Sequence, residues 1–300
     1  MVRTALTLPP ARYEYGADEF VFVEIDRAMS LEANFKAMTI TEALRARAPE
    51  GVLDICPSNA SYLIRVNPDR VHPGELVEEL RALEEDATEL TSEQELTTRL
   101  VDVPVLYDDP WTRETLLRFR DRRQHPEGTD LEYTARVNGF SGPAQLIEAL
   151  SGAPYIVTMI GFLPGLPFSY QMVPRSRQVE VPKYLRRRED TPERAFGYGG
   201  VFAVVYPVRA TGGYQLLGRA PAPVFDSTGS LPDFRAGIAF PRPGDILRYR
   251  AIDRSEYDRV RAEVERGTFR YRIRDYVFRP ADFLADPDGV TGELLEVLYR

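Results

Sequence analysis

The chain has 300 residues, of which 43% are hydrophobic, and it carries a formal net charge of −8 at pH 7. This length predicts one large domain or two ordinary ones, and the apolar fraction is sufficient for a buried core. An acidic chain repels nucleic-acid phosphates, so the composition argues against nucleic-acid binding. The single cysteine, Cys56, excludes an intramolecular disulfide and is typical of a protein of the reducing cytoplasm.

No membrane span and no secretory leader are expected. The longest apolar runs fall well short of the ~18 residues that a spanning helix needs. The first ten residues carry one arginine and no sustained apolar stretch, which is unlike a signal peptide.

The first hundred residues alternate between short apolar runs and helical patterns. Strands are expected at residues 20–25, 52–56, 62–66 and 97–106. One helix is expected after an N-cap at Ser30, and a second opens at Pro73 with Glu84 on its solvent face. The order β-α-β-β-α-β is the ferredoxin-like pattern, so residues 1–100 are predicted to form a ferredoxin-like domain.

Residues 101–252 are predicted to form a β-rich domain with a helical lead-in. Residues 110–150 have a helical pattern, with Asp109 as the N-cap and Pro110 at the first helical position. From Pro154 onward, glycine and proline separate short apolar runs at residues 155–160, 201–206, 214–217 and 246–249. Such spacing is typical of an all-β barrel or sandwich.

Residues 253–300 are predicted to form an α/β extension. A charged helix after Asp253 places Tyr257, Val260 and Val264 on one face. Between residues 269 and 274 apolar side chains alternate with arginines, which predicts a half-buried strand. Residues 293–299 are predicted to form a final amphipathic helix.

Only two histidines, His72 and His125, are present, and each directly precedes a proline. They match no zinc-ligand spacing, so no metal site is predicted. Their scarcity also argues against a Ser-His or Cys-His nucleophile. Any catalysis must therefore be carried by carboxylates, lysine, arginine, tyrosine or backbone amides.

Three stretches concentrate glycine, proline and aromatic residues. They are residues 161–168 (GFLPGLPF), residues 206–221 with TGGYQLLGRAP at their end, and residues 224–226 (VFD). Proline fixes φ and glycine permits close backbone approach. Exposed amides near Gly213, with Arg219 close by, are able to bind a carboxylate or an oxyanion. Tight turns with a salt-bridged arginine would produce the same pattern.

The order of these stretches resembles the family that covers the B-type subunit of 5-oxoprolinase, the first subunit of allophanate hydrolase, and KipI. The same unit occurs as carboxyltransferase subdomain C/D in urea amidolyase and urea carboxylase. Members read GFxPGFPYL, VPAGSVGIAGGQTGIYP, SPGGWxLIGRTP and LFD in succession. The resemblance covers about residues 12–252 and implies an α+β fold, in which a cyclophilin-like β-barrel follows the ferredoxin-like domain.

The second family signature is altered in this sequence. Its place is taken by residues 181–184 (VPKY), a charged insertion at 186–190 (RRRED), and residues 198–207 (YGGVFAVVYP). Apolar residues replace the glutamine and threonine of GGQT, and Tyr214 replaces the tryptophan of GGW. These changes fall at polar positions of the site that the resemblance implies.

The resemblance implies a site built from the matching loops, with Arg219 and Lys183 as catalytic cations. The predicted substrate-binding residues are Gly161, Phe162, Pro164, Gly165, Phe168, Gly199, Gly200, Tyr206, Gly212, Gly213, Tyr214 and Gln215. The two bends are expected to expose backbone NH groups toward one hollow that accepts an anionic or carbonyl-bearing guest.

Three functions follow from the resemblance. The first is a subunit of an amide or lactam hydrolase that uses ATP as co-substrate and has no tightly bound cofactor. The second is a carboxyltransferase subunit that uses carboxybiotin from a separate carrier, since no AMKM-like tetrapeptide is present. The third is a KipI-like inhibitor of a kinase. Each implies a homologous partner that resembles the C-type subunit of 5-oxoprolinase, the second subunit of allophanate hydrolase, or KipA.

Overall fold

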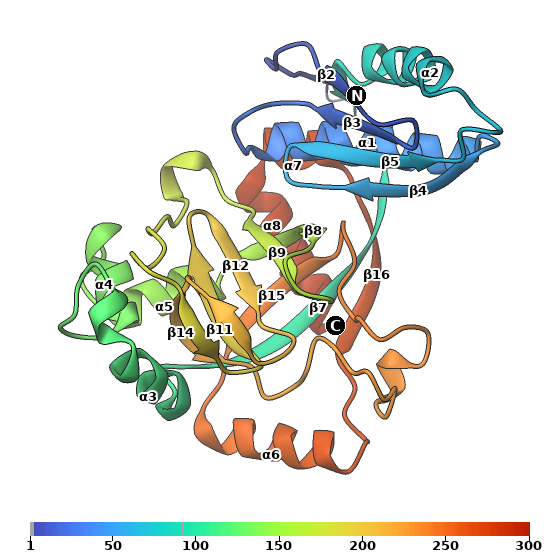
Figure 1. Ribbon diagram of the computed structural model, residues 1–300. Helices are drawn as coiled ribbons and strands as arrows, with labels where there is room; N and C mark the ends of the chain where they lie inside the picture. The colour runs from blue at the N-terminus through green and yellow to red at the C-terminus, as the bar shows by residue number, and fades with distance from the viewer. Residues whose placement is uncertain (1–2, 92) are drawn as a thin grey trace. The chain divides into compact units, whose positions relative to one another are not determined.

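The computed structural model describes residues 3–91 and 93–300 as a mixed α/β fold with several sheets (Figure 1). The chain divides into two compact units, one of residues 1–98 with 275–292 and one of residues 99–274 with 293–300. Residues 253–300, predicted as one extension, are therefore divided between the two units. No helix within the described ranges is long and apolar enough to cross a membrane.

The first unit contains a four-stranded antiparallel sheet with strand order β2-β3-β5-β4 and a separate β1-β6 pair. Its elements are β1 (Arg3–Ala5), β2 (Arg12–Gly16), β3 (Phe20–Glu24), α1 (Leu31–Arg47), β4 (Val52–Pro57), β5 (Ser61–Val66), α2 (Pro73–Asp86), β6 (Glu89–Thr91) and α7 (Pro280–Ala285). Ser30 caps α1 by accepting a hydrogen bond from the Ala33 amide, as predicted.

One predicted strand takes a different place. The ferredoxin-like pattern predicts that residues 97–106 complete the first sheet, but β7 (Leu96–Tyr107) pairs in parallel with β15 (Ile246–Ala251) in the sheet of the second unit. Strand β2 occupies the position beside β3 instead. Closing this local hairpin costs little chain entropy, which favours β2 as the neighbour of β3.

The core of the first unit follows the alternation of its strands. Val21 and Val23 of β3 and Ile64 of β5 are fully buried in the cluster that contains apolar side chains of α1 and α2. Phe35 of α1 packs against Phe278 and Phe283, with ring centroids 5.5 and 6.1 Å away. The C-terminal part of the chain therefore completes this core.

The second unit is built on an eight-stranded sheet with strand order β14-β11-β12-β9-β8-β15-β7-β16. The strands not yet given are β8 (Pro154–Ile160), β9 (Pro167–Gln171), β11 (Ala195–Gly199), β12 (Phe202–Val205), β14 (Gln215–Arg219) and β16 (Arg272–Phe278). Because β14 also pairs with β7, the sheet closes on itself. A two-stranded sheet of β10 (Arg188–Thr191) and β13 (Ala210–Gly212) lies outside this ring of pairings.

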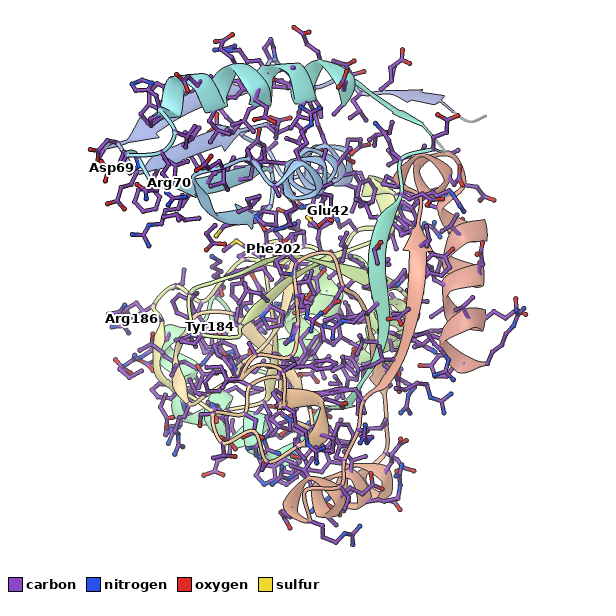
Figure 2. All side chains as sticks on the ribbon, turned by 90° about the vertical axis from the view of Figure 1, so that its right-hand side faces the viewer. Glu42, Asp69, Arg70, Tyr184, Arg186 and Phe202 are labelled. Carbon is purple, nitrogen blue, oxygen red and sulfur yellow. The ribbon has the colours of Figure 1, made fainter. Side chains whose placement is uncertain are left out.

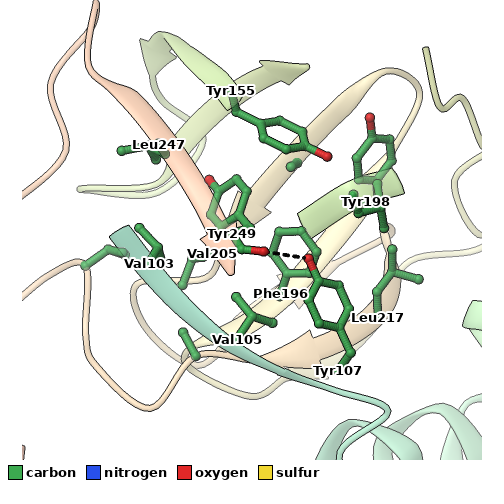
Figure 3. Packing of buried hydrophobic residues seen from close by; sticks show 14 of the residues in the cluster. Val103, Val105, Tyr107, Tyr155, Phe196, Tyr198, Val205, Leu217, Leu247 and Tyr249 are labelled. Atoms are coloured by element: carbon green, nitrogen blue, oxygen red, sulfur yellow. Dashed lines mark hydrogen bonds between the residues drawn. The ribbon is translucent and has the colours of Figure 1, made fainter. Parts of the chain in front are cut away.

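The interior of the closed sheet is filled with side chains. Figure 3 shows aromatic rings from four strands meeting there, those of Tyr107, Tyr155, Phe196, Tyr198 and Tyr249. The Tyr107 hydroxyl donates a hydrogen bond to the Tyr249 carbonyl across this interior, at 3.1 Å. A ligand cavity is therefore to be sought on the outer face of these strands.

Helices cover parts of the closed sheet. They are α3 (Pro110–Arg118), α4 (Asp130–Val137), α5 (Pro143–Ser151), α6 (Arg254–Glu265) and α8 (Pro287–Tyr299). Asp109 caps α3, as predicted, and Asp253 caps α6, the charged helix expected after it. The alternation at residues 269–274 is also present, because Phe269 and Tyr271 are buried and Arg270 is exposed. The regular strand β16 begins only at Arg272.

Candidate functional site

The outer face of β11, β12 and β14 carries a second apolar cluster. Neighbouring residues alternate in direction: Val205 and Leu217 belong to the interior core, whereas Val204 and Leu216 belong to the outer cluster with Tyr206 and Tyr214. Leu166, from the loop between β8 and β9, joins this outer cluster. A cavity of about 270 Å³ lies there.

The cavity brings together half of the predicted site residues. Those that line it are Phe162, Phe168, Lys183, Tyr206, Gly212, Gly213 and Tyr214. Its other lining residues are Leu166, Tyr184, Arg187, Val204 and Thr211. The loop at 161–168 and the turn at 211–214 thus lie on the same cavity, together with the segment at 183–187.

Two glycines make room for the tyrosines of the cavity. A Cβ atom at Gly199 would lie 2.5 Å from Cδ1 of Tyr214, so a side chain there would displace the ring. A Cβ atom at Gly212 would collide with the Tyr206 hydroxyl. It would also lie 2.8 Å from Oγ1 of Thr191. Gly199 and Gly212 therefore leave space for the aromatic rings that line the cavity.

The other predicted glycines lie in the supporting framework. The Gly161 amide donates to the Leu166 carbonyl at 3.2 Å, and the Gly200 amide donates to the Val181 carbonyl at 2.7 Å. Gly165 has φ +77°, and a Cβ there would lie 3.1 Å from the Phe225 ring. The first and last motifs are therefore in close contact through Gly165 and Phe225.

Three more predicted residues do not line the first cavity. Pro164 lies in the loop at 161–168 outside the lining set. The Gln215 side chain is buried and donates to the Pro182 carbonyl at 2.7 Å, which fixes the segment that carries Lys183. Arg219 lines a different cavity, and its Nε donates to the Glu193 carbonyl at 3.3 Å. The structure therefore separates the two predicted catalytic cations.

The charged groups of the first cavity are both cations. Lys183 and Arg187 are exposed, and in the described part of the chain neither forms an ion pair. The ammonium of Lys183 lies 5.2 Å from the centroid of the Tyr214 ring, a cation–π distance. No aspartate or glutamate is among the described lining residues. The cavity therefore favours a ligand with negative charge.

Tyr206 lines the same cavity as these cations. Tyr206 is 2% exposed. Burial raises the pKa of its phenol, while the Arg188 guanidinium and the Tyr214 amide act in the opposite direction. The phenol therefore keeps its proton at neutral pH.

A buried polar network supports the cavity wall from behind. The Asp130 carboxylate accepts hydrogen bonds from the Tyr184 hydroxyl at 2.6 Å and from the Leu216 amide at 2.7 Å. Nε of Arg123 lies 2.9 Å from the same carboxylate, at ion-pair distance but without hydrogen-bond alignment. Burial raises the pKa of Asp130, and Arg123 opposes this effect.

Arg188 extends this network toward the tyrosines. It is fully buried, donates to the Tyr214 carbonyl at 2.8 Å, and lies 4.3 Å from the centroid of the Tyr184 ring. The sequence shows Arg188 only as part of a charged insertion. Its burial could not be read from the local pattern, because its carbonyl acceptor lies 26 residues away.

The VFD motif forms a turn that stabilises the frame of the site. The Asp226 carboxylate accepts hydrogen bonds from the Thr228 amide and hydroxyl, the Ser230 hydroxyl and the Leu231 amide, at 2.6–3.1 Å. Partial burial acts to raise the pKa of Asp226, but these bonds outweigh it and hold that pKa well below its ordinary value.

Asp226→Ala is expected to lower the free energy of unfolding at neutral pH by roughly 1 kcal/mol. Because the folded-state pKa is depressed, this contribution is present above the unfolded pKa of about 4 and is lost as the pH falls below it. Urea unfolding of both proteins across this pH range is the measurement. A stability difference that stays constant down to the acid limit would contradict the assignment.

The described residues offer little for a metal. No group of three or more histidine, cysteine, aspartate or glutamate side chains within residues 3–91 and 93–300 is arranged to hold a metal ion.

Comparisons with known proteins agree with the resemblance seen in the motifs. A family model described as carboxyltransferase domain, subdomain C and D, matches residues 11–234. The B-type subunit of 5-oxoprolinase from Bacillus subtilis (strain 168) is 29% identical over 183 residues, which cover 61% of this chain and 65% of that protein. The chain therefore aligns with just under two thirds of the length of that relative.

Urea amidolyases align over nearly the whole chain. The Saccharomyces cerevisiae protein is 24% identical over 295 residues, which cover 94% of this chain and 16% of that protein. The crystal structure of the K. lactis urea amidolyase has a TM-score of 0.78 at 18% identity, covering 97% of this chain and 18% of that one. The last similarity concerns the fold alone.

Proposed function

Since the chain belongs to the family of carboxyltransferase domains, subdomains C and D, we propose that it works as one part of a multi-component enzyme. In this proposal the cavity at Lys183, Tyr206 and Tyr214 binds a small substrate that carries a carboxylate and an amide. The observation that carries the proposal is the composition of the cavity, which joins the cations Lys183 and Arg187 to the aromatic residues Tyr206 and Tyr214.

Each part of such a substrate has a matching group in the cavity. Lys183 and Arg187 supply positive charge for the carboxylate. The protonated Tyr206 phenol supplies a donor for the amide oxygen. The rings of Phe168 and Tyr214 supply an apolar wall for the carbon skeleton. A cyclic amide with one carboxylate, such as 5-oxoproline, has all three features.

The proposed reaction is ATP-dependent opening of the amide C–N bond. ATP as co-substrate transfers its terminal phosphoryl group to the amide oxygen. One water then adds to the activated carbon, the C–N bond breaks as the ring nitrogen leaves with a proton, and a second water hydrolyses the resulting acyl phosphate. The net reaction consumes lactam, ATP and two waters and yields amino acid, ADP and phosphate. In this scheme Lys183 and Tyr206 hold the substrate and stabilise the charge that develops on its oxygen. Arg219, in the second cavity, does not contact this oxygen.

The arrangement of the chain suggests how it takes part in a complex. We propose that the first unit is a ferredoxin-like domain and the second a cyclophilin-like barrel, which the closure of the sheet through β14 and β7 supports. We propose further that a homologous subunit binds beside this chain and completes the enzyme. The exposed Cys56 thiol suits the cytoplasm as its location.

Carboxyl transfer is the second candidate function. It is favoured by the reach of the alignment with urea amidolyase, which covers 94% of this chain, whereas that with the 5-oxoprolinase relative covers 61%. In this case the cations would hold the carboxylate of carboxybiotin, and the tyrosine hydroxyls would bind the acceptor amide.

The test is turnover by the assembled complex. The full chain is co-expressed with its homologous partner subunit, and ADP release is measured with and without 5-oxoproline. We expect ADP release to require 5-oxoproline and both subunits. If a correctly assembled complex shows no such dependence, lactam opening is wrong. Carboxyl transfer from a carboxybiotin carrier by the same complex would then establish the second candidate.

A further inference from the structure

A second cavity in the same unit has a different chemical character. It has a volume of about 360 Å³ and shares no lining residue with the first. Its wall includes Trp111, Arg118, Arg209 and Arg219, with Glu114 and Glu193 as the carboxylates. Helix α3 supplies Trp111, Glu114 and Arg118 from one face, because these residues are three and four positions apart.

Arg219 presents its guanidinium to this cavity. Its Nε donates to the Glu193 carbonyl at 3.3 Å, and the group lies 5.3 Å from the centroid of the Trp111 ring. These two contacts fix the side chain. In the described part of the chain Arg219 forms no ion pair, so the remaining donors of its guanidinium are available to a ligand.

The other arginines add positive charge to the cavity. Arg118 and Arg209 both bind the same carboxylate, that of Asp190, each at 2.5 Å, so this group of three carries one net positive charge. Glu193 pairs with Arg194 at 3.1 Å. Among the described residues of the wall, Glu114 alone opposes the cations without an ion pair of its own.

We propose that the second cavity binds a phosphate group, free or as part of a phosphate ester, with Arg219 as a direct ligand. Arginines on three separate segments suit an oxyanion that accepts hydrogen bonds on several oxygens. The wider surroundings support this, because burial together with the nearby charges of Arg219 and Arg261 lowers the pKa of Arg194. Such a concentration of like charge is relieved when an anion binds.

Trp111 provides a direct measurement, because it is the single tryptophan of the chain and lies in the wall of this cavity. The full chain is titrated with inorganic phosphate and, separately, with ATP at constant ionic strength. We expect a saturable change in tryptophan fluorescence, with a Kd of about the millimolar range for free phosphate. Tighter binding of ATP would identify a phosphate ester as the ligand, and equal binding would identify free phosphate.

Two variants test whether Arg219 binds the phosphate directly. Arg219→Met is expected to weaken phosphate binding by roughly tenfold or more. Because this change also alters the surroundings of Trp111, equilibrium dialysis with labelled phosphate is measured in parallel. Glu114→Gln, on the same wall, is the matched control and is expected to bind phosphate as tightly as the parent chain or more tightly.

The outcome is independent of the proposed function. Lys183→Met alters the first cavity only, so this variant is expected to bind phosphate as tightly as the parent chain. If the complex shows no lactam turnover, the proposed function fails, but the phosphate proposal still stands or falls on its own titration. No saturable response to phosphate, or full retention of binding in Arg219→Met by dialysis, would overturn the proposal.

Discussion

Replacing Asp130 with alanine is expected to lower the free energy of unfolding by about 3–5 kcal/mol, the usual cost of removing one partner of a buried ion pair. The change leaves the Arg123 guanidinium, the Tyr184 hydroxyl and the Leu216 amide without their acceptor in an interior that excludes water. Urea unfolding at neutral pH measures the effect. Because Tyr184 lines the first cavity, ligand binding there is expected to weaken as well.

The matched control for this experiment is Asp121→Ala. Asp121 also forms an ion pair, with Arg186 at 3.0 Å, but both side chains are about two-thirds exposed. Removing an exposed pair usually changes stability by less than about 1 kcal/mol. If Asp130→Ala were no more destabilising than Asp121→Ala, the buried network would not support the cavity wall.

Replacing Lys183 with methionine is expected to lower turnover of the assembled complex by roughly 10²–10³-fold, with little change in melting temperature. The large effect follows from the proposed role of its ammonium beside the developing charge on the substrate. The small effect on stability follows from the exposure of the side chain. Steady-state kinetics with thermal unfolding of the same preparations separates the two effects. Equal turnover in the parent and Lys183→Met complexes would remove Lys183 from the mechanism.

Arg186→Met is the control for Lys183. Arg186 lies three residues further along the same segment and is not among the residues of the cavity wall. Its side chain is 69% exposed and projects outward in Figure 2. This variant removes an equal charge from the same segment, so it is expected to retain parental turnover. A comparable loss of activity in both variants would indicate a general effect of surface charge.

Features that depend on local sequence were predictable. Ser30, Asp109 and Asp253 each cap a helix with a side chain that reaches an amide two or three residues away. The place of β7 was not predictable, because either sheet could have accepted its apolar pattern. Glu84 was predicted to lie on the solvent face of α2, but it is half-buried. Its carboxylate pairs with the buried Lys36 at 3.1 Å, a contact that the local sequence does not show.

Some features of the candidate site could likewise be predicted from the sequence, and others could not. Motif order identified the two bends that line the first cavity, including Phe168 and Gly213. Spacing could not show that Lys183 and Arg219 lie in separate cavities, because their relative positions depend on the tertiary fold. The role of Asp130 was hidden as well, since it meets Leu216 across 86 residues of chain. Such contacts exist only once the tertiary fold has formed.

The ring contacts of Phe35 have a consequence for the order of events on the ribosome. Phe35 leaves the ribosome long before Phe278 and Phe283, the rings against which it packs, because both lie far later in the chain. At a typical rate of about 5–20 residues per second, the nascent N-terminal segment waits for roughly ten seconds or more before these rings arrive. During that interval the Phe35 ring lacks both partners, and the packing around it is completed only when Phe278 and Phe283 dock.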